Sequence, residues 1–162
     1  MKSQGEIEAA VCDGIARFQQ EFIGRGPRDI HAHLIGTLLV VRLQGVLTPA
    51  ERQLITPPPD PAGAALGNGH AGSGNGNGHG NGNGNGNGHD HGNGNGNGRA
   101  LLKQVRAHMV ATGRPRLERI VQEATGVGMV SVHHDISTIT GEEVIVFSLA
   151  DPPDCRQKKP PK

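Results

Sequence analysis

The stretch Thr37–Arg52 reads TLLVVRLQGVLTPAER and decides how the chain folds. Its dense apolar run, Leu38 to Val41, has the length of a buried strand rather than of a helix. The run leads into Thr48-Pro49-Ala50-Glu51, where the threonine hydroxyl and the glutamate carboxylate can each accept from the other residue's backbone N–H. Proline suits the first helical turn, because its missing N–H would have no helical partner there. A core strand therefore passes directly into a capped helix, and the rest of the fold packs around this corner.

The chain on either side of a long low-complexity tract repeats one pattern. In the first half, an amphipathic helix carries an apolar stripe from Ile7 to Phe22, and a strand with His31 and His33 turns back at Gly36 into the apolar strand quoted above.

In the second half, helical periodicity starts at Arg99, and Pro115 is expected to kink the helix or split it in two. A strand with His133 and His134 then turns back into an apolar strand that ends at Leu149. Two helix–hairpin halves of this kind predict an α+β fold, a two-layer sandwich of four mostly antiparallel strands with the helices on one face. The sequence leaves the strand order open.

Residues 57–98 are mostly Gly and Asn, with His70, His79, His89 and His91 among them. Because the part of this tract from Gly67 to Gly98 has no apolar residue able to offset its ordering entropy, we expect a disordered insertion in a single domain made of residues 1–56 plus 99–151. Residues 152–162 are expected to form a flexible basic tail. The histidines of the tract leave open a metal-handling function, since imidazole binds nickel, copper and zinc.

The composition excludes several classes of function. The formal net charge is only +1, Trp and Tyr are absent, and Phe occurs three times, so neither duplex nor single-stranded nucleic acid is an expected partner. The first residues lack the apolar segment of a signal peptide, and no apolar run approaches the about 18 residues that span a bilayer. Two cysteines without a bridging spacing fit a reducing compartment. We expect a cytoplasmic protein without direct membrane insertion, which reaches the inner membrane only through a partner.

One face of the predicted sheet mixes apolar, charged and imidazole side chains, which is typical of a contact surface. We predict that this face binds a partner or a second copy through Val40, Arg42, His31, His33, His133, Asp135, Val144 and Val146. A plain solvated surface, or anion binding at the arginine, are the alternatives. Three imidazoles and a carboxylate of this set would suit zinc if they converge. No activated nucleophile or acid–base pair is evident, so no catalytic residue, cofactor or resident metal is predicted, and the chain is not expected to be an enzyme.

Several motifs, kept in order over nearly all of the folded part, resemble the MpsC-like family. They are Gly5-Glu6-Ile7-Glu8, Gly24-Arg25-Gly26-Pro27, Val41 through Glu51, Leu102-Lys103-Gln104-Val105-Arg106, Thr125-Gly126-Val127, Asp135-Ile136-Ser137-Thr138 and Gly141-Glu142. The Gly/Asn/His tract departs from the family pattern. The resemblance implies a homodimeric accessory or regulatory subunit of a membrane ion or inorganic-carbon transport system that generates membrane potential. It supplies no catalytic residues.

Overall fold

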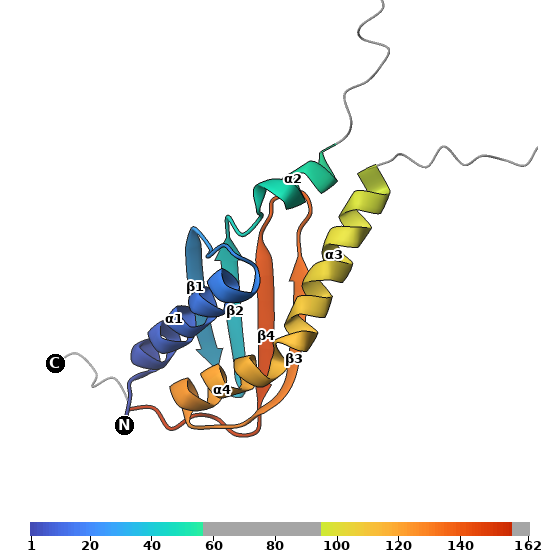
Figure 1. Ribbon diagram of the computed structural model, residues 1–162. Coiled ribbons are helices and arrows are strands. Elements are labelled where there is room, and N and C mark those ends of the chain that lie inside the picture. The colour runs from blue at the N-terminus through green and yellow to red at the C-terminus, as the bar shows by residue number, and fades with distance from the viewer. Residues whose placement is uncertain (57–94, 157–162) are drawn as a thin grey trace, which may run out of the picture.

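The computed structural model describes residues 1–56 and 95–156 (Figure 1). Along the chain the elements are α1 (Gln4–Phe22), β1 (Asp29–Ile35), β2 (Leu38–Gln44), α2 (Pro49–Ile55), α3 (Asn95–Thr112), α4 (Arg114–Thr125), β3 (Met129–Ile136) and β4 (Glu143–Leu149). Both capping boxes are formed, Ser3 with Glu6 at the start of α1 and Thr48 with Glu51 at the start of α2.

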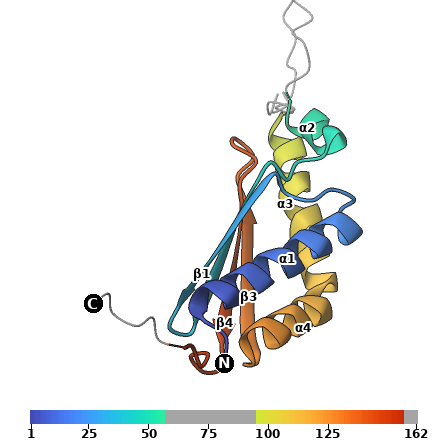
Figure 2. The ribbon, with the colours of Figure 1, turned by 90° about the vertical axis from the view of Figure 1, so that its left-hand side faces the viewer.

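The four strands form one antiparallel sheet in the order β1-β2-β4-β3. The hairpin of each half contributes one central and one edge strand, and the halves join where β2 pairs with β4. Figure 2 shows the helices together on one face of this sheet, which leaves the other face uncovered. The predicted two-layer α+β sandwich is confirmed.

The core lies between the helices and the inner face of the sheet. Alternate strand residues supply it, as the period of two requires. Leu39, Val41 and Leu43 of β2 and Ile145 and Phe147 of β4 are fully buried. Helix α1 covers them with the apolar stripe predicted from its sequence, and only its last member, Phe22, is partly exposed, at 37%.

Glycines set how closely the helices pack. A Cβ on Gly14 would lie 2.4 Å from Ile120 Cγ2, so the absence of a side chain permits α1 and α4 to touch. Gly113 separates α3 from α4 at the predicted break before Pro115, and a Cβ there would lie 2.4 Å from Phe18 Cε2. The connection between α3 and α4 therefore packs directly against Phe18 in the core of the first half.

Three sequence expectations need correction. Helix α3 begins at Asn95 rather than Arg99, within the tract expected to be disordered; Gly98 lets its first turn approach the Leu54 carbonyl at the end of α2. The sequence alternation that puts Val132, His134 and Ile136 on the inner face predicts the same face for Val130, but the register of β3 shifts between Met129 and Ser131, and Val130 is 60% exposed.

The expected flexible tail also starts later than residue 152. Pro153 is buried, Cys155 packs against the core, and the Arg156 N–H donates to the Lys2 carbonyl at 3.0 Å. Small apolar side chains at alternate positions anchor this segment beside the start of α1. The rest of the tail, and residues 57–94 of the predicted insertion, lie outside the described residues.

Candidate functional site

The residues predicted as a contact surface lie together on the uncovered sheet face, which we call the outer face. The strand register places them in two adjacent rows that cross all four strands. One row is His31–Arg42–Val144–Asp135 and the next is His33–Val40–Val146–His133. A third row, Ile35–Leu38–Ser148–Ser131, continues the face.

This outer face is apolar in the middle and polar at its sides. Val40, Val144 and Val146 are half-buried on the central strands, and Leu38 in the third row is 43% exposed. The outer-face histidines of the edge strands, His31, His33 and His133, are exposed. An apolar centre with a polar rim is the usual anatomy of a protein–protein contact.

Two ion pairs hold the charges of the first row in place. Arg42 donates to the Glu142 carboxylate through Nε at 2.8 Å and Nη2 at 2.6 Å. The hydrogen bond from Arg42 keeps the pKa of Glu142 below its ordinary value, and the same bond raises the pKa of Arg42. On the edge strand β3, Lys103 donates to both oxygens of Asp135, at 2.8 and 2.9 Å, and this bond lowers the pKa of Asp135. The row therefore has a fixed cation on β2 and a fixed anion on β3.

The imidazoles of this face do not converge on a metal site. His31 and His33 lie on β1 and His133 and Asp135 on β3, the opposite edges of the sheet. Three strand spacings of about 4.8 Å put these groups about 14 Å apart, far beyond the reach of one ion. In residues 1–56 and 95–156, no group of three or more His, Cys, Asp or Glu residues is placed to hold a metal. The histidines of the low-complexity tract lie outside the described residues.

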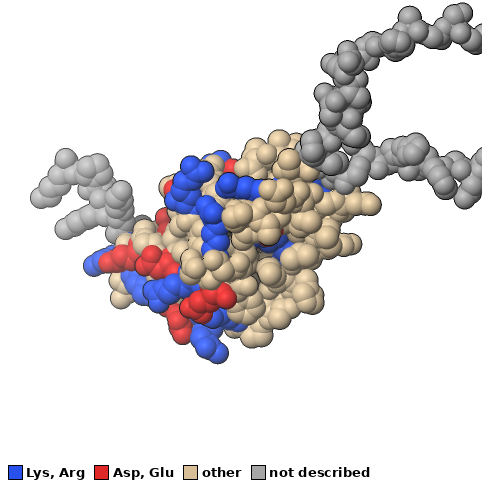
Figure 3. All heavy atoms as spheres, turned by 45° about the horizontal axis from the view of Figure 1, so that its top comes forward, with Lys and Arg blue, Asp and Glu red and all other residues tan. Residues whose placement is uncertain are grey.

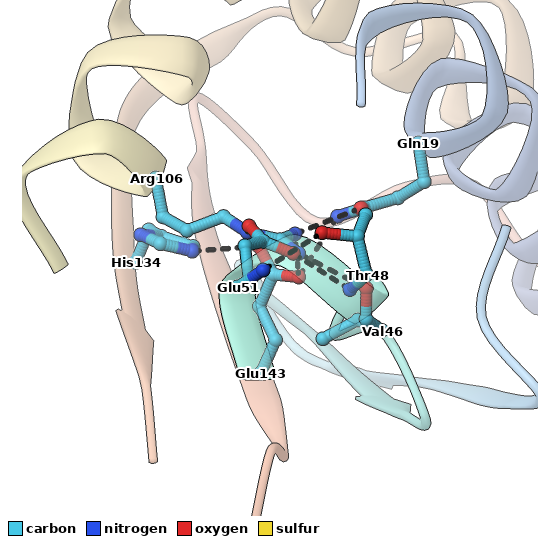
Figure 4. A network of polar contacts seen from close by, with 7 residues as sticks. All are labelled: Gln19, Val46, Thr48, Glu51, Arg106, His134 and Glu143. Carbon is cyan, nitrogen blue, oxygen red and sulfur yellow. Dashed lines mark hydrogen bonds and ion pairs between the residues drawn. The ribbon is translucent and has the colours of Figure 1, made fainter. Parts of the chain in front are cut away.

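A second polar site, which was not predicted from the sequence, lies inside the core around Arg106 of α3 (Figure 4). The Arg106 side chain is 0% exposed, yet all its nitrogens donate. Nε and Nη2 donate to the two oxygens of Glu51 at 2.7 and 2.8 Å, and Nη2 also donates to the Val46 carbonyl at 3.0 Å. Nη1 donates to Gln19 Oε1 and Glu143 Oε2, each at 3.2 Å. We call this set, together with His134, the arginine network.

The two carboxylates of the arginine network, Glu51 and Glu143, differ in their burial and in their hydrogen-bond partners. Glu143 is fully buried and also binds His134 Nε2 at 2.6 Å and accepts from the Gln19 amide at 2.9 Å. Burial acts to raise the pKa of Glu51, but the hydrogen bonds from Arg106 and from the Thr48 backbone outweigh it and leave this pKa below its ordinary value. A buried cation is tolerable when it is paired and hydrogen-bonded in this way.

The arginine network joins both halves of the chain. Gln19, Val46 and Glu51 come from α1, the β2–α2 connection and α2, whereas Arg106, His134 and Glu143 come from α3, β3 and β4. The only sequence signal is a polar residue in a core-facing position: Glu143 extends the inward alternation of Ile145 and Phe147, and Arg106 lies one turn after Leu102. Glu51 was recognised from sequence only as a capping residue.

Two surface grooves in the described part of the chain are separate from the arginine network. One groove of about 610 Å³ lies between α1 and α4 and is lined partly by Arg17, Arg116 and Arg119. Another of about 610 Å³ lies at the α2 end of the sheet, beside Arg28 and Arg52. Neither is lined by a residue of the arginine network.

Viewed from the α2 end of the molecule, charged side chains gather on the side of α1 and β1, and the α3 side is mainly uncharged (Figure 3). Leu54 of α2 and Leu101 and Val105 of α3 are between 38% and 47% exposed. We call these three exposed apolar side chains on the neighbouring helices α2 and α3 the α2–α3 patch. In the described part of the chain, no helix has the length and apolar character needed to cross a membrane.

Comparison with known proteins identifies the family. Residues 3–62 and 92–151 match the family model described as "Na+-translocating membrane potential-generating system (MpsC)", so the chain belongs to the MpsC family. This confirms the resemblance read from the motifs. The chain is also similar to the uncharacterized protein YbcI of Bacillus subtilis (strain 168), with 26% identity over 150 residues, 93% of this chain and 90% of YbcI. No solved structure matches the chain.

Proposed function

We propose that this protein is a non-catalytic accessory or regulatory subunit of a membrane-potential-generating ion or inorganic-carbon transport system. In this proposal it is a cytoplasmic homodimer that meets the membrane through other protein chains, and the outer face of the sheet is its contact surface. The family description supports the link to a membrane-potential system.

The observation that carries the proposal is the outer face itself. Two full rows of mixed apolar and polar side chains lie on a sheet face that none of the helices in residues 1–56 and 95–156 covers. A four-stranded sheet packed on one side commonly turns a polar face to water. Here the two central strands instead carry Leu38, Val40, Val144 and Val146 on that face.

The arginine network supports a non-catalytic role. Its charged groups contact each other, and the side chains of Arg106 and Glu143 are 0% exposed. Groups that hold one another in this way stabilise the packing of α1, α2 and α3 on the sheet, whereas a catalytic acid or base needs a route to its substrate.

Pull-down from native membranes tests this function. We expect the tagged wild-type chain to recover a membrane transport subunit, and Val40→Lys, which puts a charge at the centre of the outer face, to recover much less of it. Val105→Lys makes the same change in the α2–α3 patch and serves as the matched control, with recovery unchanged. Recovery of the tagged chain and its own copies alone, with no transport subunit, would contradict the proposal.

A further inference from the structure

Helices α1 and α4 form the walls of a groove of about 610 Å³. The two helices run antiparallel. Lys2, just before α1, donates to two backbone carbonyls at the end of α4, and Gly113, just before α4, packs against Phe18 near the end of α1. Between these ends, Gly14 of α1 meets Ile120 of α4. Residues at matching levels of the two helices therefore lie across the groove from each other.

Arg17 and Arg119 occupy matching levels of this groove. Both side chains are exposed, and both line the groove. Arg17 follows Gly14 on α1 by less than one helical turn. Arg119 directly precedes Ile120 on α4. Because Gly14 and Ile120 mark the point where the helices touch, two guanidinium groups come together from opposite walls of the groove.

Neither guanidinium of this pair has a carboxylate partner within the fold. In residues 1–56 and 95–156, Arg17 and Arg119 make no hydrogen bond and no ion pair. The two other arginines of α4 each have a glutamate: Arg114 pairs with Glu118, and Arg116 pairs with Glu21. Two like charges that face each other without a counter-charge are unfavourable, and a bound anion removes this repulsion.

Charge separates this groove from the one at the α2 end of the sheet. The groove between α1 and α4 is lined by three arginines and by Glu123, a formal charge of three minus one, or +2. Glu21, which pairs with Arg116 from outside the lining, lowers this charge to +1. The groove at the α2 end is lined by two arginines and two carboxylates and is neutral. The groove between α1 and α4 is therefore the one that favours an anionic occupant.

Apolar side chains continue the groove on both sides of the two arginines. Ala10 and Ile120 lie on one side, and Phe22 and Pro115 lie on the other. A small inorganic anion would leave this apolar surface in water. An amphipathic helix instead lays its apolar face into a groove of this kind. An Asp or Glu in the middle of that face would meet the two guanidinium groups, which bind carboxylates through paired hydrogen bonds.

Two other occupants fit the charges less well. A flat anionic membrane would also meet Asp13, Glu21 and Glu123, which are exposed carboxylates on the same two helices. A second copy of the chain would have to offer the exposed apolar side chains of its α2–α3 patch. Helix α3 contributes most of that patch, and its sequence has basic residues but no Asp or Glu. This pairing would bring cations together.

Beyond the proposed function, we propose that the groove between α1 and α4 binds an amphipathic helical segment of a partner protein. Arg17 and Arg119 hold a central Asp or Glu of that segment, and its apolar side chains pack against Ile120 and Phe22. The site lies on the helix layer, so the outer face of the sheet stays free for its own contacts. The inference does not depend on whether the partner is a transport subunit.

Selection of phage-displayed helical peptides on the immobilised full chain tests this site. Selected peptides should carry Asp or Glu between apolar residues spaced three or four positions apart. In fluorescence anisotropy with labelled synthetic copies, Arg17→Glu and Arg119→Glu should each weaken binding by about tenfold or more, because each reversal brings like charges together. Arg52→Glu makes the same change in the groove at the α2 end and is the matched control, with affinity unchanged.

A second measurement separates binding from folding. Because Arg17 faces Arg119 without a partner, Arg17→Glu should melt at the same temperature as wild type or higher, as followed by far-UV circular dichroism. A selected peptide with Lys in place of its acidic residue should bind the double variant Arg17→Glu/Arg119→Glu more tightly than it binds wild type. This exchange of charges moves only if the peptide and the two arginines are in contact.

Several results would overturn the proposal. These are a selection that enriches no peptide over an unrelated protein, selected peptides without an acidic residue, and peptides that bind Arg17→Glu as tightly as wild type. A lower melting temperature of Arg17→Glu would show that Arg17 supports the fold instead. Binding to phosphatidylglycerol vesicles, or self-association in sedimentation equilibrium, that Arg17→Glu abolishes would assign the groove to a membrane or to a second copy. The pull-down from native membranes tests the proposed function separately, so either proposal can fail alone.

Discussion

Replacing Arg106 with methionine should strongly destabilise the protein. Methionine retains most of the apolar stem but removes the charge, which is completely buried. The Glu143 carboxylate then keeps only Gln19 and His134, and Glu51 keeps only its capping bonds to Thr48. Glu51 can gain some hydration because its side chain is 12% exposed, but Glu143 at 0% cannot.

The expected loss of stability follows from this difference in exposure between Glu51 and Glu143. Removing one partner of a buried ion pair costs about 3–5 kcal/mol, because the remaining charge is left without compensation. Small domains have about 5–15 kcal/mol of stability in total, so the variant should keep its fold with little margin. With a urea m-value of about 1.5 kcal/mol/M, the unfolding midpoint should fall by about 2 to 3 M.

Urea unfolding followed by far-UV circular dichroism is the appropriate assay, because the chain has no Trp and no Tyr for intrinsic fluorescence. The control is Arg114→Met, which removes an exposed pair with Glu118 and should cost less than about 0.5 kcal/mol. Adding Glu143→Gln to Arg106→Met should recover part of the loss, since no unpaired charge is then buried at that position. A midpoint within about 0.5 M of wild type for Arg106→Met would show that the buried ion pairs of Arg106 do not stabilise the fold by the expected amount.

Two further predictions concern acid stability and helix packing. The folded-state pKa of Glu51 is lowered, so its contribution to stability is present above the ordinary value of 4.5 and is lost as the pH falls through the lower folded value. Wild type should therefore lose more stability than Glu51→Gln in urea titrations compared at pH 7 and below pH 4.5, and parallel losses would contradict this. Gly14→Ala should cost about 1–3 kcal/mol by clashing with Ile120, whereas Gly5→Ala, which meets nothing within 4 Å, should be neutral or slightly stabilising in thermal unfolding. Equal melting temperatures for the two alanine variants would show that α1 and α4 do not need their close contact.

Local patterns were sufficient to predict the layers of this fold. The alternation in β2 separates Leu39, Val41 and Leu43 from Val40 and Arg42, so the sequence alone assigned the inner and outer faces. The two capping boxes and the break near Pro115 are also local, and the structure has all three. The residues that lie on the outer face were predictable from the same alternation.

Features that depend on distant partners were not predictable. The separation of His33 from His133 follows from the strand order, which no local pattern encodes. Burial of Arg106 is favourable only because Gln19 and Glu143, 87 and 37 positions away in sequence, meet it in the core. Likewise, Pro153 and Cys155 read as part of a tail, and only the fold shows the surface against which they pack.

The claim that the outer face is the contact surface can be tested most directly by backbone amide NMR. Spectra of the wild-type chain over a dilution series report on each residue without any substitution. Our account predicts that concentration-dependent shifts are confined to the central strands, Leu38–Gln44 and Glu143–Leu149, and to their outer-face neighbours on β1 and β3. Shifts confined to the α2–α3 patch or to the groove between α1 and α4, or none at any concentration, would contradict it.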